Sequence, residues 1–225
     1  MKKGYYTFED IKRHAKLTSA LKIAIDHVDD FEQKIPRNEV WMHENFFRTI
    51  LKDIDWRTEV TVVGSYRRKV DIMGDIDFLI TASHIPFQAL REQVFDRLIP
   101  ELFRKNYLKG RLAAGNSQTG KRWIGAASLP GSDPVWRRVD ILLAPPEEYG
   151  AALWFYTGSQ TFNRGMERLA ASKGYLLDNK GLWKVEGQGQ NGEELTKGKL
   201  VEGRSEAKTF GLLGERWRAP ENRNY

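Results

Sequence analysis

The hydrophobic pattern of the chain changes at about residue 59, and this change constrains the fold more than any other feature. Before it, apolar residues recur at helical spacing, as in Leu21, Ile25, Val28 and Phe31. After it come segments with the β-branched or alternating patterns of strands. The segments expected to be strands are 59–63, 75–81, 106–113, 122–129 and 136–143. The expected helices are two short ones within 7–33, and 36–52, 86–103, 147–156, 160–173 and 205–213.

This order of elements predicts an α+β fold, in which a mixed β-sheet with flanking helices is followed by a small C-terminal α/β subdomain. The Pro145-Pro146 pair marks the clearest boundary, and the glycine-rich segment 181–203 is expected to be poor in strands. The parts expected from these boundaries are 1–33, 34–145 and 146–225. A chain of 225 residues can bury a substantial core without disulfides or structural metals.

Composition excludes several classes of function. The chain has no cysteine, which rules out disulfide frameworks, thiol catalysis and cysteine-based zinc sites. No apolar run approaches the roughly 20 residues that cross a bilayer, and no signal peptide is expected at the start. The net charge of +6 admits a polyanionic partner without requiring one. We therefore expect a soluble intracellular protein that makes no membrane contact.

Three aspartates are candidates for chemistry. Asp75 and Asp77 open one expected strand and point to the same face, because side chains alternate along a strand. This pair alone is common by chance and is more often structural than functional. Asp140 interrupts the apolar run of another expected strand, where an acid is costly to bury unless it is paired or metal-bound. If the two strands are neighbours, the three carboxylates predict a site for two Mg²⁺ ions, or Mn²⁺, as in phosphoryl transfer.

A possible phosphate-binding turn lies upstream of these acids. Gly64-Ser65 follows an expected strand and opens a helix, so backbone N–H groups and a hydroxyl are available to phosphate oxygens. Arg68 can add a charge-assisted contact. Without the acids, a simple helix start with solvated arginines would be the favoured interpretation. The turn, the arginine and the three aspartates together form a specific combination that seldom arises by chance.

These motifs resemble the family X DNA polymerases, the group of DNA polymerases beta, lambda and mu. The resemblance rests on IPR at 35–37, GSYRRKVDIMGDIDFLIT at 64–81, RRVD at 137–140, YTGSQTFNR at 156–164 and FGLLGERWRAPENRNY at 210–225. It covers nearly the whole chain in the order of the family. The ending and the modest loop at 113–120 are most similar to the lambda branch.

The resemblance implies a role for each matching residue. Asp75 and Asp77 would bind both metals, and Asp140 would bind the catalytic metal and take the proton of the primer 3′-hydroxyl, with Arg138 holding Asp140 in place. The incoming nucleotide would be bound by Lys34, Ser65, Arg68, Gly74, Phe155, Tyr156, Gly158 and Asn163. Arg164 and Glu167 would lie at the template strand, and Arg122 is a candidate contact for DNA phosphates. A cis peptide is expected between Gly158 and Ser159.

The chain departs from the family pattern at several positions. Lys69 replaces a glycine, the aromatic pair Phe155-Tyr156 is inverted, and Glu167 replaces an arginine that contacts the template in relatives. Glu167 predicts lower fidelity or altered templating, and the inverted aromatic pair leaves the sugar discrimination open. Residues 4–33 resemble only the tail of the DNA-binding subdomain that precedes the palm. The resemblance therefore predicts no deoxyribose-phosphate lyase activity and a weak grip on DNA.

The function expected from these observations is template-directed DNA synthesis by two-metal catalysis, filling short gaps in repair or end joining. Residues 34–145 would be the catalytic palm, and residues 146–225 the subdomain that binds the nucleotide and nascent base pair. The partners would be primer–template or gapped DNA and dNTP, bound by a monomer that is nuclear if the source is eukaryotic. The alternatives are a terminal-transferase-like enzyme, another nucleotidyltransferase of the same superfold, or a non-catalytic DNA-end-binding module.

Overall fold

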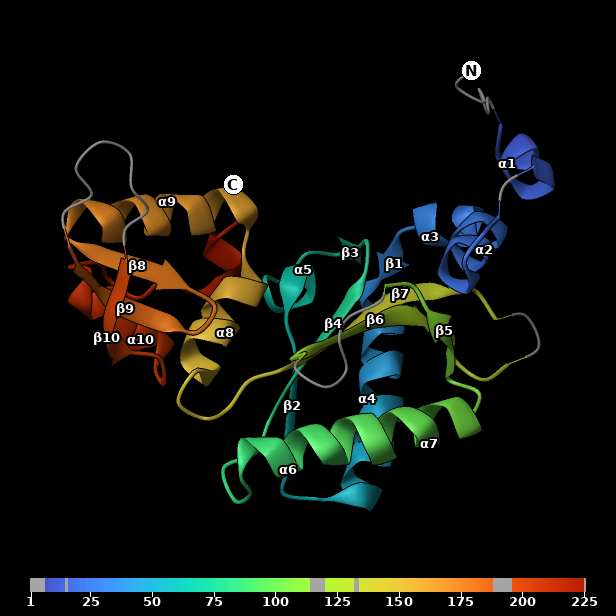
Figure 1. The fold of residues 1–225 in the computed structure, drawn as a ribbon, viewed down its shortest axis with the longest axis horizontal. Helices are drawn as coiled ribbons and strands as arrows, with labels where there is room; N and C mark the ends of the chain where they lie inside the picture. Colours follow the sequence, from blue (N-terminus) through green and yellow to red (C-terminus); the bar gives the residue numbers. More distant parts are fainter. Residues whose placement is uncertain (1–6, 15, 114–119, 132–133, 188–195, 225) are drawn as a thin grey trace.

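The protein consists of a five-stranded sheet with helices and a smaller three-stranded sheet with its own helices, side by side in Figure 1. The computed structural model describes residues 7–14, 16–113, 120–131, 134–187 and 196–224. Most of the loop at 113–120 lies outside these described residues. None of the helices within these ranges is both long and apolar enough to span a bilayer. The α+β fold class predicted from the sequence is confirmed.

The N-terminal segment forms three short helices, α1 (Phe8–His14), α2 (Ser19–Asp26) and α3 (Val28–Glu32), where two were predicted. A reciprocal capping box begins α1. The Asp10 N–H donates to the Thr7 hydroxyl and the Thr7 N–H to the Asp10 carboxylate, each over 3.1 Å. The helices lie at the end of the large sheet farthest from the C-terminal subdomain (Figure 1).

The large sheet has the strand order β2-β4-β7-β6-β5. Its strands are β2 (Glu59–Val62), β4 (Ile76–Thr81), β5 (Leu108–Arg111), β6 (Arg122–Ala127) and β7 (Arg137–Leu143). Only β4 and β7 pair in parallel, and every other neighbouring pair is antiparallel. Each strand falls within a segment that the sequence predicted. The parallel pair joins the two aspartate-bearing strands, as the metal-site hypothesis required.

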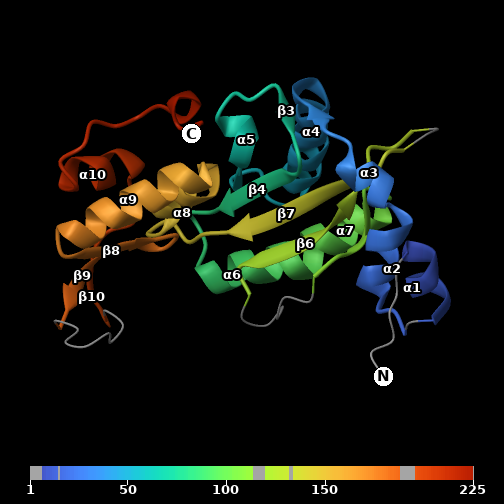
Figure 2. The same cartoon turned by 90° about the horizontal axis from the view of Figure 1, so that it is seen from above.

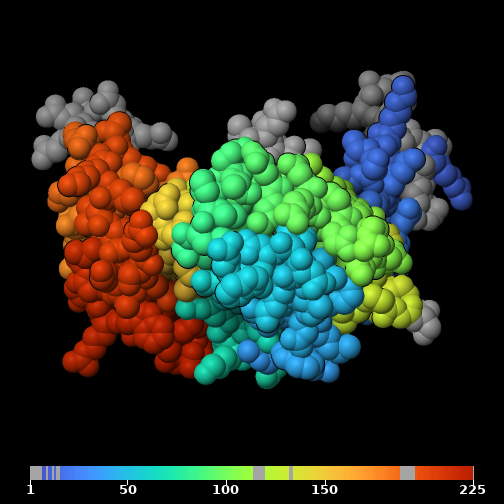
Figure 3. All heavy atoms as spheres, turned by 90° about the horizontal axis from the view of Figure 1, so that it is seen from below, coloured from blue at the N-terminus to red at the C-terminus, as the bar shows by residue number. Residues whose placement is uncertain are grey.

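Long helices cover one face of this sheet. They are α4 (Arg37–Ile54) and a continuous run of α6 (Phe87–Glu92), the π-helical turn η1 (Gln93–Leu98) and α7 (Ile99–Arg104). Seen from below, their atoms lie side by side over the sheet (Figure 3). The buried α4 residues Val40, Phe47, Ile50 and Leu51 recur at helical spacing and lie on one face of the helix. They pack against apolar side chains of β2, β4 and β7 in the main core.

Three short elements lie together near β4, and two of them, α5 and β3, are visible there in the view from above (Figure 2). They are α5 (Gly64–Arg67) and the antiparallel pair of β1 (Ile35–Pro36) and β3 (Ile72–Met73). The sequence did not predict this pair, because two-residue strands leave no periodic pattern. The pairing holds the segment before α4 against the segment before β4.

The C-terminal subdomain packs helices against the sheet β10-β9-β8. Its elements are α8 (Tyr149–Thr157), α9 (Gln160–Ser172), β8 (Tyr175–Asp178), β9 (Gly181–Glu186), β10 (Thr196–Glu202), α10 (Glu206–Leu212) and the 3₁₀ turn η2 (Pro220–Asn222). The prediction that 181–203 is poor in strands was wrong, since β9 and β10 lie there. The glycines of this segment allow neighbouring strands to pack closely. A Cβ on Gly198 would lie 2.4 Å from the Glu186 side chain. A Cβ on Gly181 would lie 2.3 Å from Leu200.

Gly165 in the middle of α9 offers a test of this packing. A Cβ there would meet nothing within 4 Å. Gly165→Ala should therefore raise the free energy of unfolding by about 0.5–1 kcal/mol, because alanine loses less backbone entropy in a helix. Urea unfolding measures the change.

Gly125 in β6 is the contrasting control. A Cβ there would lie 2.1 Å from the Trp123 ring and 2.4 Å from the Gly110 carbonyl oxygen. Gly125→Ala should therefore lower the free energy of unfolding by about 1–3 kcal/mol through overpacking. A stabilised Gly125 variant, or a destabilised Gly165 variant, would contradict the packing described here.

Candidate active site

The three aspartates meet at one end of the parallel strand pair. Asp77 in β4 is in register with Asp140 in β7, and Asp75 immediately precedes β4. Burial raises the pKa of Asp77 to about 8, with further contributions from the charges of Asp75 and Asp140. Burial also raises the pKa of Asp140, against the opposing effect of a hydrogen bond from Arg122. The cluster therefore favours a cation.

Two arginines supply part of that positive charge. Arg138 Nη2 lies 3.2 Å from Asp75 Oδ2, and Arg122 forms a hydrogen-bonded ion pair with Asp140. The sequence had assigned the Asp140 contact to Arg138 and a DNA contact to Arg122, so the pairing differs from that expectation. The strand register explains the difference. Asp140 pairs with Ile124 of β6, which places Arg122 two positions along the same face.

The donor set suits a hard divalent cation, because three carboxylates offer only oxygen ligands. Across the described ranges, however, no three or more His, Asp or Glu side chains are already arranged to hold a metal ion. The guanidinium contacts at Asp75 and Asp140 explain this, since each occupies carboxylate oxygens that a metal would need. Mg²⁺ or Mn²⁺ therefore fits the residues, provided that the Arg122–Asp140 ion pair is exchanged.

A cavity of about 350 Å³ opens beside Asp75 and Asp77, between α5 and the junction of α8 with α9. Eight residues predicted from the sequence line it: Ser65, Arg68, Asp75, Asp77, Phe155, Tyr156, Gly158 and Asn163. Four more that were not named as nucleotide-binding residues also line it: Gly64, Thr157, Ser159 and Gln160. Gly64 belongs to the predicted phosphate-binding turn, and the other three lie within two residues of Gly158, so reading each turn as a whole would have found them.

Gly64 lets α5 begin directly against Asp77. A Cβ on Gly64 would lie 2.5 Å from Asp77 Oδ2, and the residue has a φ of +60°, which disfavours other side chains. The first turn of α5 and the buried carboxylate therefore share one wall of the cavity. The sequence indicated this glycine as the end of a strand, but not its contact with Asp77.

Arg68 joins the two sides of the cavity. Its guanidinium donates to the Thr157 carbonyl oxygen, to Ser65 Oγ over 3.2 Å and to Asn224 Oδ1 over 2.8 Å. The peptide bond between Gly158 and Ser159 is cis, as predicted. Arg68 thus contacts α5, the Thr157–Gly158 turn and the C-terminal segment together.

The residues expected around the sugar and base are hydrogen-bonded within the protein. Asn163 Nδ2 donates to the Phe155 carbonyl oxygen over 2.7 Å, whereas its buried Oδ1 has no partner. Asn179 Nδ2 donates to the Tyr156 hydroxyl over 3.1 Å. The Phe155 and Tyr156 rings meet edge to face, with centroids 5.3 Å apart. The inverted aromatic pair is therefore fixed by contacts from α9 and from the β8–β9 turn.

The remaining predicted residues do not line the cavity. Gly74 lies beside Arg138, since a Cβ there would be 3.8 Å from Arg138 Nη2. Lys34 and Arg164 are exposed, and Glu167 is partly exposed. Glu167 lies four residues after Asn163 on α9, so both side chains project from the same helix face. The side chains of Lys34, Arg164 and Glu167 are therefore accessible to solvent.

A buried ion network joins the two subdomains beside the cavity, and the sequence did not reveal it. Glu206 of α10 accepts two hydrogen bonds from Arg67 of α5, over 3.0 and 3.1 Å, and one from Arg223 over 2.7 Å. Arg223 is fully buried and its guanidinium lies over the Phe162 and Phe210 rings. Arg67 also donates to Thr157 Oγ1 over 2.7 Å. This network fixes α5, and with it Arg68, against the C-terminal subdomain.

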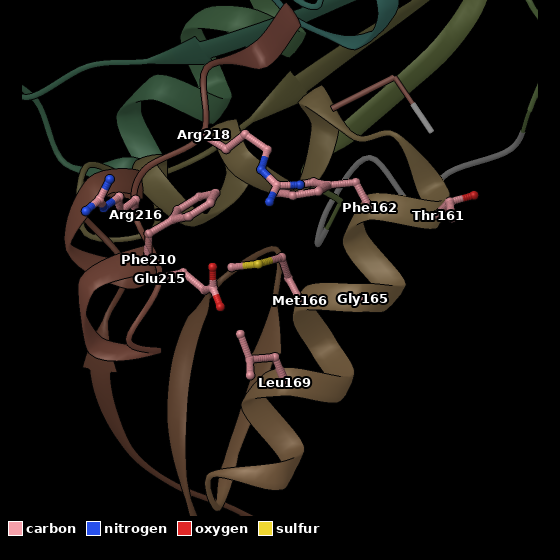
Figure 4. Close-up of a pocket in the computed structure, with 9 residues that line it drawn as sticks. All are labelled: Thr161, Phe162, Gly165, Met166, Leu169, Phe210, Glu215, Arg216 and Arg218. Carbon is pink, nitrogen blue, oxygen red and sulfur yellow. The ribbon is translucent and has the colours of Figure 1, made fainter. Parts of the chain in front are cut away.

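A second cavity, of about 200 Å³, lies between α9 and the segment that follows α10. Phe162, Met166 and Phe210 form its apolar wall, and the Arg218 guanidinium lies over the Phe162 ring at 5.7 Å (Figure 4). The three aspartates are absent from its lining. The catalytic candidates therefore belong to the larger cavity.

Two family models match adjacent parts of the chain. The model described as DNA polymerase beta palm matches residues 34–146, and the model described as DNA polymerase beta thumb matches residues 152–224. The chain belongs to the family X DNA polymerases. The aspartates therefore lie in the segment that matches the palm, and α9 in the segment that matches the thumb.

Individual relatives agree with this family. The chain is 32% identical to DNA polymerase lambda of Rattus norvegicus over 99% of its own length and 38% of that relative. It is 26% identical to DNA nucleotidylexotransferase of Xenopus laevis over 98% of its length and 48% of that relative. The chain thus spans less than half of these relatives. A crystal structure of Leishmania infantum polymerase beta, titled as a ternary P/T complex, matches with a TM-score of 0.85 and 30% identity, covering 99% of this chain and 90% of that one.

The Glu206 network makes a prediction about stability and pH. Burial alone would raise the pKa of Glu206, but hydrogen bonds from Arg67 and Arg223 hold it below its ordinary value. Glu206→Gln should lower the free energy of unfolding by about 3 kcal/mol near neutral pH, since it leaves buried Arg223 without its counter-charge. The measurement is urea unfolding from pH 7 to pH 3.

The sign of the pH effect follows from the lowered pKa. The contribution of Glu206 is complete above its unfolded pKa of about 4.3 and is lost as the pH falls through the lower folded value. The difference in the free energy of unfolding between wild type and Glu206→Gln should therefore become smaller as the pH falls. Glu101→Gln, which breaks the exposed pair with Arg104 on α7, should have little effect at any pH. A gap for Glu206→Gln that widens in acid would contradict this account.

Proposed function

We propose that the chain is the catalytic core of a template-directed DNA polymerase, which transfers a nucleotidyl group from dNTP to a primer 3′-hydroxyl. The observation that carries the proposal is one cavity that combines Asp75 and Asp77, next to Asp140, with Arg68 and Ser65. Acidic metal ligands facing phosphate-binding groups are what in-line phosphoryl transfer requires. Family membership supports the same conclusion.

Asp75, Asp77 and Asp140 would hold two Mg²⁺ ions, with Mn²⁺ as a substitute, and bound metal would neutralise charge that develops on the phosphoryl oxygens. Asp140 would accept the proton of the primer hydroxyl. Arg138, which contacts Asp75, would position that carboxylate. The chemistry would thus be carried by residues 34–145.

The nucleotide would occupy the 350 Å³ cavity. Ser65, Arg68, Gly74 and Lys34 would bind the triphosphate through hydroxyl, guanidinium, backbone and ammonium groups. Phe155, Tyr156 and Gly158 would line the sugar pocket, and Asn163 would approach the base. Asn163 Nδ2 is engaged by the Phe155 carbonyl oxygen, so the side chain would have to turn to present its buried Oδ1 to the base.

Primer–template or gapped DNA would lie against α9. Arg164 and Glu167 would face the template strand from this helix, in the subdomain of residues 146–225, and residues 1–33 would extend the DNA-binding surface. The solved relative described as a ternary P/T complex supports such partners. A monomeric intracellular enzyme of short-gap repair or end joining, nuclear in a eukaryote, is the cellular role that we infer.

The relative named DNA nucleotidylexotransferase makes template-independent extension the second candidate. A primer-extension assay separates the two. Gapped, templated and single-stranded primers should be compared in Mg²⁺ and in Mn²⁺. Template-directed synthesis requires that the templating base select the added nucleotide, whereas equal extension of single-stranded primer would favour the second candidate.

Asp140→Ala should abolish primer extension, because it removes both a metal ligand and the proposed proton acceptor. DNA affinity, measured by fluorescence anisotropy, should change little. Asp53→Asn is the matched control, since Asp53 is an exposed acid at the far end of α4. Surviving extension by the Asp140 variant would overturn the assigned mechanism.

Glu167→Arg should lower the misinsertion rate, because an arginine on this face of α9 can donate to the template strand where a carboxylate repels it. Single-nucleotide insertion kinetics for correct and incorrect dNTP measure the ratio. Glu186→Arg makes the same charge change on β9, away from the cavity, and should leave the ratio unchanged. An unchanged ratio for Glu167→Arg would refute the template contact.

A further inference from the structure

We propose that Arg122 is an exchangeable counter-ion of Asp140: it pairs with Asp140 in the free protein and leaves it for a DNA backbone phosphate. DNA binding would thereby release Asp140 for a divalent metal. The inference rests on the proposed polymerase function and adds a regulation of the same site. The supporting observations are the ion pair itself, its unequal exposure and its position on β6.

The ion pair is buried at one end and open at the other. The Asp140 side chain is 11% exposed, whereas the Arg122 side chain is 53% exposed. A guanidinium in this position can leave the carboxylate without unpacking the core, because its other face already meets solvent. Asp140 cannot follow it, since β7 is a central strand of the sheet.

Arg122 can move while its strand stays fixed. Trp123, the next residue, is buried and packs edge to face against Phe103 with centroids 6.1 Å apart. Side chains alternate along a strand, so Trp123 anchors β6 from the face opposite to Arg122. The preceding Lys121 is paired with Glu148. Rotation of one side chain is therefore sufficient for the exchange.

The charges at the site require such an exchange. Counted with all three carboxylates ionised, these carboxylates and the two guanidinium groups leave a formal charge of −1, which attracts a divalent cation only weakly. Release of Arg122 exposes the Asp140 oxygens and increases the negative charge felt by a metal. A guanidinium binds phosphate oxygens with the same two-pronged geometry as a carboxylate, so DNA phosphate is a suitable second partner.

Because Arg122 cannot hold both partners at once, DNA and metal must each strengthen the binding of the other. In wild type, DNA should raise the affinity for Mn²⁺ by about 5-fold or more. Arg122→Gln should bind Mn²⁺ more tightly than wild type without DNA, and DNA should add little further affinity. Removing the Arg122 guanidinium should thus raise the Mn²⁺ affinity in the same way as adding DNA does.

The experiment is a Mn²⁺ titration followed by electron paramagnetic resonance, with and without gapped DNA whose primer ends in a dideoxynucleotide. No dNTP is added, so no catalysis is involved. Asp140→Asn, titrated with the same DNA, supplies the background of Mn²⁺ bound by the nucleic acid and by the other carboxylates. Unfolding curves confirm that each variant is folded.

Lys121→Gln is the matched control, because it removes the same charge one residue away from a side chain paired with Glu148 instead of Asp140. It should keep the wild-type coupling between DNA and metal. Equal gains in Mn²⁺ affinity for Lys121→Gln and Arg122→Gln would overturn the proposal, since general electrostatics would then suffice. Wild-type coupling in Arg122→Gln would overturn it as well.

Primer extension by the wild-type protein is measured in parallel to separate the two proposals. If DNA does not raise the Mn²⁺ affinity of the wild-type protein but primer extension is normal, only the proposed role of Arg122 is rejected. Absence of templated extension by wild type would reject the proposed function, whatever the Mn²⁺ titration shows.

Discussion

Parallel pairing of β4 with β7 is the constraint on which the site depends. It places Asp77 beside Asp140 on one face of a sheet whose other face is covered by α4 and α7. Carboxylates held this close, in a partly buried position, repel one another, and burial with this repulsion raises the pKa of Asp77 to about 8. The positive charges of Arg122 and Arg138 beside the cluster partly offset this repulsion.

The second requirement is that the cavity beside the aspartates keep its shape, although its walls come from two subdomains. Glu206 holds these walls together, because it accepts hydrogen bonds from Arg67 of α5 and from fully buried Arg223. Arg68 then contacts the Thr157 carbonyl oxygen across the same joint. Charges that are costly to bury singly are stable here because each has a partner. The joint therefore contributes to the proposed binding of the nucleotide as well as to stability.

Local patterns predicted the elements that depend on local physics. The apolar runs of the strands and the helical spacing of apolar residues were both readable, because burial imposes a fixed spacing on the sequence. The prediction failed at 181–203. Gly181 and Gly198 permit close contacts between strands there, but in the sequence a high glycine content is typical of a loop. The two-residue strands β1 and β3 were missed because nothing periodic marks them.

The sequence by itself determined which residues carry the candidate chemistry. Three aspartates, a Gly-Ser turn and an arginine are recognisable by type and spacing, and eight of the predicted residues line one cavity. Only the tertiary structure decided which charges meet. Arg122 contacts Asp140 because β6 and β7 pair in one register, and Arg67 reaches Glu206 across 139 residues of chain. Such partners are set by strand order and subdomain packing, which bring together groups that no local pattern connects.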